Sequence, residues 1–183
     1  MATCGKGLFT SILQQIFSSK GERLAELAFA TELKLELDAI TRKEHGISAF
    51  TTNPSEKALI RPEMVALGAK RRKESNGTYW LDKVVAQIEK MKEGDYYNGV
   101  IISDARYLNE LKALGSIENV NFHSCYLARI LENGELLGPA NDEEARNNPE
   151  VEAEAKHRLK WPTFSEEEVY KAREVVEILV SRF

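Results

Sequence analysis

The sequence has few of the features that mark secreted, membrane-spanning or redox-active proteins. Its 183 residues include two cysteines, Cys4 and Cys125, and no Cys-x-x-Cys pair. This excludes a disulfide scaffold, a zinc–cysteine cluster and a dithiol redox site. No apolar run approaches the roughly 20 residues of a membrane-spanning helix, and the first residues lack the pattern of a secretory signal. We therefore expect a cytoplasmic protein without a membrane partner.

The sequence also lacks an excess of positive charge. Lysine and arginine number 25 against 29 aspartates and glutamates, which gives a formal net charge of -4. No nucleic-acid partner is expected, and any anion site must be local. With 43% hydrophobic and 30% charged residues and no repeat or linker, residues 1–183 are expected to form a single domain with one core. The sequence leaves the oligomeric state open and is compatible with a homodimer.

Helical spacing of apolar residues dominates the first half of the chain. The expected helices are 8–17, one or two segments within 24–40, 54–68 and 79–91. The clearest strand is 99–103, an apolar run with β-branched residues that suits a strand covered on both faces. A short helix at 109–114 and a second strand within 120–130 would complete a βαβ unit and hence a parallel sheet.

The last part of the chain is expected to be helical again. Residues 141–159 are charged and are predicted to form a helix that Trp161-Pro162 ends. Ser165 to Glu168 has the form of a capping box, which predicts a final helix up to Phe183.

Gly5-Lys6-Gly7 stands directly before the first expected helix. At that place backbone N–H groups and the helix dipole favour a phosphate, and a lysine adds a positive charge. The segment matches the second half of a phosphate-binding loop, whose first glycine would fall before Met1. Gly7 replaces the hydroxyl residue that normally contacts Mg²⁺. The alternative interpretation is a solvated helix start.

Asp104 and Arg106 follow the best strand, at the edge where open α/β sheets bind ligands. Arginine can hold a phosphate or a base edge through two hydrogen bonds, and the aspartate can orient it. An ordinary ion pair at a strand end is the other interpretation.

Several other cations are candidates for a local anion site. Arg61 and the run 70–73, which includes Arg72, form the strongest basic concentration. Lys34 lies within an expected helix, and Arg129 closes the second expected strand. Each can equally be a solvated surface charge. The three histidines show no metal-ligand spacing, so no metal site is predicted, and no serine or cysteine has the context of a nucleophile.

Taken in order, these segments resemble the deoxynucleoside monophosphate kinases of bacteriophages, a branch of the P-loop kinases. The resembling blocks are residues 5–7, 27–34, 60–68, 79–80 and 100–110. The resemblance spans most of Gly5 to Arg129. It implies an α/β fold of three layers with a mainly parallel sheet, which here lacks its first strand, and it implies the host-cell cytoplasm for a phage-encoded protein.

The resemblance also implies site residues. Gly5, Lys6 and Gly7 would bind the phosphates of ATP, and Arg129 would lie in the region that closes over the transferred group. The residues expected around the acceptor nucleoside monophosphate are Lys34, Arg61, Arg72, Trp80, Asp104 and Arg106. Lys6, Asp104, Arg106 and Arg129 would form the catalytic set, with ATP and Mg²⁺ as cofactors.

By this resemblance the reaction is transfer of the ATP γ-phosphoryl group to a deoxynucleoside monophosphate, mainly through positioning and charge neutralisation. The incomplete phosphate loop keeps a second hypothesis open, a catalytically impaired relative that binds nucleotides or a protein as a regulator or inhibitor. A third is an interaction protein without a nucleotide site.

Overall fold

The structure, a computed structural model, describes residues 4–139 and 141–183. It is a mixed α/β protein, as expected, with two small parallel sheets of two strands each. The chain divides into two compact units: unit 1 takes the chain up to Glu26 and from Tyr96 onward, and unit 2 is the inserted segment Leu27–Asp95. The expected single domain over 1–183 stays a prediction.

Unit 1 holds the strands and the helices that pack on them. Its elements are α1 (Lys6–Ser19), β1 (Leu24–Leu27, which crosses into unit 2), β2 (Gly99–Ile102), α5 (Leu108–Gly115), β3 (Cys125–Arg129), α6 (Asp142–Glu154), β4 (His157–Trp161), the 3₁₀ turn η1 (Glu166–Glu168) and α7 (Val169–Val180). Strand β1 pairs with β2, and β3 pairs with β4 in parallel, from Cys125 opposite His157 to Arg129 opposite Trp161.

A βαβ unit is present, but not the one that the sequence predicted. The expected unit joined the strand at 99–103 to the strand within 120–130, whereas the structure places β2 and β3 in different sheets. The parallel partner of β3 is β4, and helix α6 forms the crossover between them. The prediction of parallel strands is therefore confirmed, whereas the predicted pairing of the strand at 99–103 with the strand within 120–130 is wrong.

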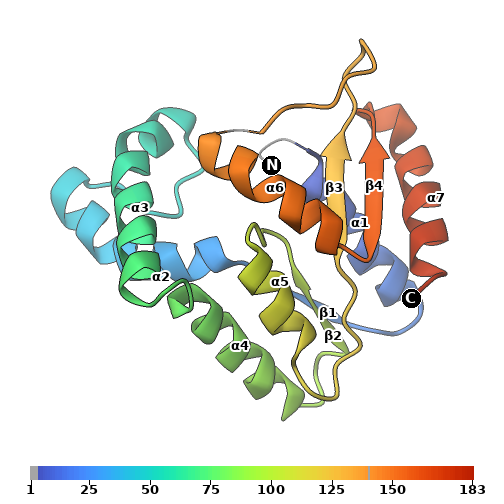
Figure 1. Cartoon of the computed structure of the whole chain (residues 1–183), viewed down its shortest axis with the longest axis horizontal. Coiled ribbons are helices and arrows are strands. Elements are labelled where there is room, and N and C mark those ends of the chain that lie inside the picture. The colour runs from blue at the N-terminus through green and yellow to red at the C-terminus, as the bar shows by residue number, and fades with distance from the viewer. Residues whose placement is uncertain (1–3, 140) are drawn as a thin grey trace. The chain divides into compact units, whose positions relative to one another are not determined.

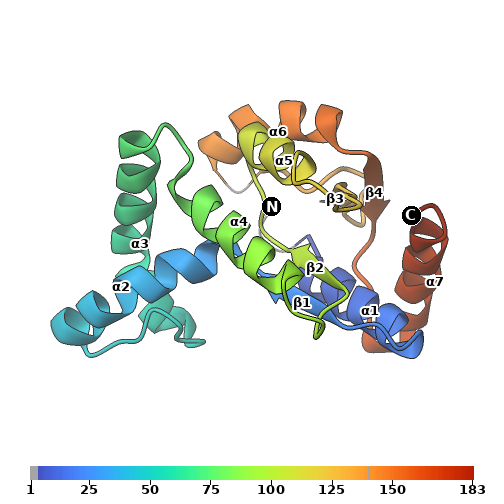
Figure 2. The same ribbon diagram turned by 90° about the horizontal axis from the view of Figure 1, so that it is seen from below.

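The core of unit 1 lies between α1, α7 and the β3–β4 pair. Ile12, Leu13 and Ile16 of α1 pack with Trp161 and with Val176 of α7. Figures 1 and 2 show α1 and α7 on one side of β3 and β4 and α6 on the other. These apolar residues recur at intervals of three and four, so each helix turns one stripe toward the sheet.

Strand β4 was missed because its charged residues resemble a continuing helix. The predicted helix 141–159 ends at Glu154, and His157 begins a strand. Its exposure alternates: Leu159 is half-buried and Trp161 buried, whereas Arg158 and Lys160 are exposed. This period of two was the available signal for a strand. The predicted capping box at Ser165 and Glu168 is confirmed, and η1 with α7 follows it.

Strand β1 was also missed. Residues 24–27 were assigned to a helix, but they pair with β2, and the helix α2 begins only at Phe29. Strand β2 is confirmed within 99–103, yet its residues are half-buried rather than covered on both faces. In the described part of the chain, β2 has β1 as its one strand partner, which explains its remaining exposure.

Unit 2 is helical and confirms the predicted helices 54–68 and 79–91. It contains α2 (Phe29–His45), α3 (Pro54–Glu74) and α4 (Tyr79–Lys92). Helix α2 ends where Gly46 adopts a left-handed conformation with φ of 68°, a conformation that favours glycine. Helix α3 starts at Pro54, and the Asn53 side chain caps it by accepting a hydrogen bond from the Ser55 amide.

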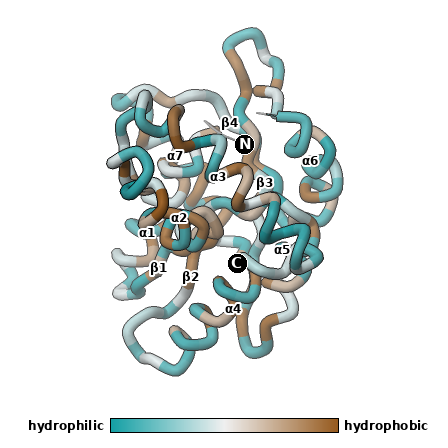
Figure 3. Tube along the Cα trace, turned by 90° about the vertical axis from the view of Figure 1, so that its left-hand side faces the viewer, coloured by the Kyte–Doolittle hydropathy of each residue, from teal (hydrophilic) through white to brown (hydrophobic). Residues whose placement is uncertain are grey.

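Polar and apolar residues alternate along the helices, and the apolar residues are not concentrated in any one helix. Figure 3 shows polar and apolar residues interleaved along the helical turns. In α7, for example, the apolar Val176 is buried while its neighbour Glu177 is exposed. Among residues 4–139 and 141–183, no helix combines the length and apolarity of a membrane span.

Candidate functional site

The chain turns sharply at Gly5, directly before α1. Gly5 is the N-cap of α1 and adopts a left-handed conformation with φ of 88°. As a glycine, this N-cap residue has no side chain that could cap the helix. The first amides of a helix need an acceptor, and a start with a glycine N-cap and with Lys6 in its first position favours a phosphate.

Trp161 fixes this loop against the sheet. Its indole Nε1 donates a hydrogen bond of 2.9 Å to the Cys4 carbonyl, and its ring lies directly against Gly5. Phe9 packs edge-to-face on the same ring, with 5.8 Å between ring centroids. Trp161 is 2% exposed and is the last residue of β4. The start of α1 therefore lies at the carboxyl end of β4.

Arg129 ends β3 at the same edge. It is the register partner of Trp161, and its Nε donates a 2.6 Å hydrogen bond to the Thr163 hydroxyl just beyond β4. The carboxyl edge of a parallel sheet is where α/β proteins bind ligands. The structure thus brings the Gly5–Lys6 loop, predicted to bind ATP, and Arg129, predicted to lie near the transferred group, to one edge of the β3–β4 pair.

The two glycines of the loop make a matched pair of substitutions. We expect Gly5→Ala to lower the free energy of unfolding by about 1–2 kcal/mol, because a side chain is strained in the left-handed region and its Cβ would lie 3.1 Å from the Trp161 ring. Gly7→Ala has open space around it and should stabilise helix α1 by about 0.5–1 kcal/mol. Urea denaturation measures both. Equal effects of the two substitutions would contradict the assigned loop geometry.

A second predicted segment, Asp104 to Arg106, forms a fixed turn after β2. The buried carboxylate of Glu110 accepts hydrogen bonds from the backbone amides of Arg106, at 2.8 Å, and Tyr107, at 3.1 Å. Asp104 is half-buried just beyond the end of β2. Because Glu110 lies in the first turn of α5, the turn after β2 is tied to the helix that follows it.

The Arg106 side chain is directed to helix α6. Its Nη1 lies 2.8 Å from Oε1 of Glu144, which is 4% exposed, while Arg106 itself is 42% exposed. The Tyr107 hydroxyl donates a 2.5 Å hydrogen bond to the neighbouring Glu143. One edge of the guanidinium is thus held by a buried carboxylate. Arginine carries five N–H donors, so an ion pair on one edge leaves the arginine able to bind an anion as well.

Comparisons with models of known families, with curated proteins and with solved structures found no match.

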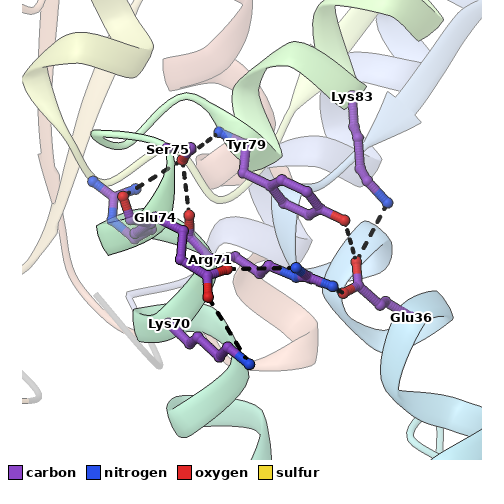
Figure 4. A network of polar contacts seen from close by, with 8 residues as sticks. Glu36, Lys70, Arg71, Glu74, Ser75, Tyr79 and Lys83 are labelled. Atoms are coloured by element: carbon purple, nitrogen blue, oxygen red, sulfur yellow. Dashed lines mark hydrogen bonds and ion pairs between the residues drawn. The ribbon is translucent and has the colours of Figure 1, made fainter.

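In unit 2 the most developed polar arrangement is centred on Glu36 and is called the Glu36 cluster (Figure 4). Arg71 donates to Glu36 Oε1 from Nε at 2.7 Å and from Nη2 at 2.5 Å. The Tyr79 hydroxyl donates to Oε2 at 2.7 Å, and the Lys83 ammonium lies 3.6 Å from the same oxygen. Two cations and a phenol from α3 and α4 therefore converge on one carboxylate of α2.

These contacts set the ionisation of Glu36. Burial raises the pKa of this carboxyl, but the hydrogen bonds from Tyr79 and Arg71, with the charges of Arg71 and Lys83, outweigh burial and leave the pKa lowered. The side chain is 19% exposed, so solvent screens these interactions only partly. The Glu36 cluster holds together all three helices of unit 2.

We expect Glu36→Gln to lower the free energy of unfolding by about 1.5–3 kcal/mol, since hydrogen bonds to a charged group are lost. Glu74→Gln is the control, because Glu74 is half-exposed and contacts Arg71 at 3.4 Å, and it should cost no more than about 0.5 kcal/mol. Chemical denaturation followed by circular dichroism measures both. Similar small effects would show that the cluster contributes little stability.

The difference in unfolding free energy between the wild type and Glu36→Gln should depend on pH. Folding lowers the pKa of Glu36, so its contribution is fully present above about pH 4.3, the ordinary glutamate pKa. That contribution is lost as the pH falls through the lower pKa of the folded state. The stability difference between the wild type and Glu36→Gln should therefore shrink in this acid range.

The acceptor residues predicted in unit 2 are distributed along its helices. Lys34 lies on α2 with its Nζ 5.7 Å from the centroid of the Phe50 ring. Arg61 is exposed and Arg72 half-buried on α3. These two arginines are 11 positions apart on one helix, which corresponds to about 16 Å along its axis. The two arginines therefore lie about three helical turns apart.

Trp80 and Arg72 each directly follow, in the sequence, a residue of the Glu36 cluster. Trp80 is buried and packs edge-to-face on Tyr79, with 4.8 Å between the ring centroids. Glu36 is contacted by Tyr79 and Arg71, the residues that directly precede Trp80 and Arg72. One step along a helix turns a side chain by about 100°, so neighbouring residues face different directions. Sequence reasoning had grouped Arg71 with the basic run but gave no role to Glu36 or Lys83.

The prediction that cysteine provides no nucleophile agrees with the site of Cys125. Burial raises the pKa of this thiol to about 11. The thiolate is the reactive form of cysteine, and burial here favours the protonated thiol.

Proposed function

We propose that this protein transfers the γ-phosphoryl group of ATP to a deoxynucleoside monophosphate, on a P-loop kinase-like fold. The observation that supports this best is the common position of the Gly5–Lys6 loop and Arg129 at the carboxyl edge of the β3–β4 pair. A helix start with a glycine N-cap, a lysine and an arginine at such an edge suit a phosphorylated ligand.

In this proposal the residues act by charge and position. A phosphate oxygen of the monophosphate attacks the γ-phosphorus in line, a new P–O bond forms, and the bond to the β-phosphate oxygen breaks as ADP leaves. Lys6 and the first amides of α1 hold the ATP phosphates. Arg106 holds the acceptor phosphate, Asp104 orients the acceptor site, and Arg129 neutralises charge on the transferred group.

The chain does not fit the usual Mg²⁺ contact of this kind of site. Gly7 has no hydroxyl, Thr10 is buried, and Ser11 is exposed further along α1. We therefore assign no protein ligand to Mg²⁺ and expect the ion to arrive bound to the nucleotide phosphates.

A second candidate function is a nucleotide-binding regulator without catalysis. It is favoured by the ion pair of Arg106 with the buried Glu144, which reduces the positive charge available to an acceptor, and by Gly7 in place of a hydroxyl residue. An assay of ADP formation with each deoxynucleoside monophosphate, combined with calorimetry of ATP and monophosphate binding, separates the two. The regulator predicts monophosphate binding without turnover.

A further inference from the structure

Three metal-ligating side chains meet where helix α2 ends in unit 2. Glu44 and His45 form the end of α2, and Glu63 lies on α3. His45 Nε2 contacts Glu63 Oε1 directly, and the ligand atoms of the three residues all lie within 4.8 Å of one another. Ligand atoms around a tetrahedral Zn²⁺ are about 3.3 Å apart, given bonds of about 2.0–2.2 Å. Side-chain rotations can close this difference.

One oxygen of this group is buried without a partner. Among the described residues, Glu63 Oε2 has no hydrogen-bond donor although its surface is inaccessible to solvent. The other oxygen of the same carboxylate contacts His45. A buried acceptor without a donor costs about 1–3 kcal/mol, and a cation beside the carboxylate would satisfy both oxygens.

The backbone around the group is well fixed. The amides of Gly46 and Ile47 bond to the last carbonyls of α2, and Asp38 accepts hydrogen bonds from the Ser48 hydroxyl at 2.6 Å and the Ala49 amide at 2.8 Å. These contacts hold the connection between α2 and α3, so His45 and Glu63 face each other before any ligand binds. A helix C-terminus also favours a positive charge.

We propose that Glu44, His45 and Glu63 form a binding site for a divalent first-row transition metal ion of the Zn²⁺ type, with water as a fourth ligand. An imidazole nitrogen with two carboxylates suits zinc, whereas Mg²⁺ and Ca²⁺ prefer sites made of oxygen alone. The ion would join α2 to α3. None of these three residues is assigned to the nucleotide, and the proposal does not depend on the proposed kinase activity.

Calorimetric titration with Zn²⁺ of protein freed of metal by a chelator tests the site. We expect the wild type to bind Zn²⁺ saturably and His45→Ala and Glu63→Gln to bind it about tenfold or more weakly, the loss typical of a damaged metal site. His157→Ala is the control for loss of an imidazole outside the proposed site, since His157 Nε2 lies 3.4 Å from His123 Nδ1 in unit 1. It should retain the wild-type affinity within about twofold.

Two further readouts separate a metal site from a simple ion pair. Because the ion bridges two helices, Zn²⁺ should raise the melting temperature of the wild type and of His157→Ala but not of His45→Ala. Excess Mg²⁺ should not displace the ion. Absence of saturable Zn²⁺ binding in the wild type, unchanged binding in His45→Ala, or equal competition by Mg²⁺ would each overturn the proposal. Circular dichroism confirms that the variants are folded.

Discussion

Replacing Lys6 by alanine is expected to lower the rate of ADP formation by about 10²–10³-fold, the usual loss when one group that stabilises transition-state charge is removed. Lys6 is the first residue of α1, where the helix start and the Gly5 turn are held against Trp161. The substitution removes a positive charge without disturbing that packing. Both kcat and the affinity for ATP should fall.

Lys20→Ala is the matched control for this prediction. Lys20 follows the other end of the same helix, with its Nζ 5.4 Å from the centroid of the Phe17 ring. The substitution Lys20→Ala removes one positive charge, as Lys6→Ala does, but at the opposite end of α1 from the Gly5–Lys6 loop. The rate of ADP formation should therefore stay within about twofold of the wild type. If the two variants behave alike, Lys6 is only a surface lysine at a helix start.

Arg106→Ala is expected to lower kcat/KM for the deoxynucleoside monophosphate by about 100-fold or more, since a charge-assisted contact to phosphate is worth roughly 1.5–3 kcal/mol in binding alone and more in the transition state. The KM for ATP should change little. Arg106→Lys keeps the charge but loses the two-pronged geometry, so it should recover only part of the activity.

Arg106 also pairs with a buried carboxylate, and Glu144→Gln separates this structural role from binding. Removing the arginine leaves Glu144 without the 2.8 Å ion pair, which destabilises the fold. Glu144→Gln breaks the same pair while keeping the guanidinium in place. We expect Glu144→Gln to retain the monophosphate affinity and Arg106→Ala to lose it. Equal losses would reduce Arg106 to a structural ion pair.

Local patterns predicted most helices and the apolar strand β2, because apolar spacing and β-branched runs reflect which face of a segment is buried. Strands β1 and β4 were wrongly assigned to helices. In β4 the alternation from His157 to Trp161 was present, but the charged helix α6 before it extended the helical pattern. In β1 four residues are too few to show a period.

Contacts between distant segments could not be predicted in the same way. Glu36 meets Arg71 and Tyr79 across 35 and 43 positions, and no spacing rule indicates that three helices turn these side chains toward each other. The same holds for Glu63, whose contact with His45 gives the histidine a carboxylate neighbour that histidine spacing alone did not reveal. The start of a helix after Gly5 was predictable from local spacing, whereas the anchoring of Gly5 by Trp161 was not.

The most direct measurement is the formation of ADP and deoxynucleoside diphosphate by the purified wild-type protein, with each deoxynucleoside monophosphate tested in turn. We expect both products in equal amounts, only when ATP, Mg²⁺ and an acceptor monophosphate are all present, and a loss of about 10²–10³-fold in Lys6→Ala. No product above the blank, together with a melting temperature that neither ATP nor any monophosphate changes, would contradict the proposed nucleotide site.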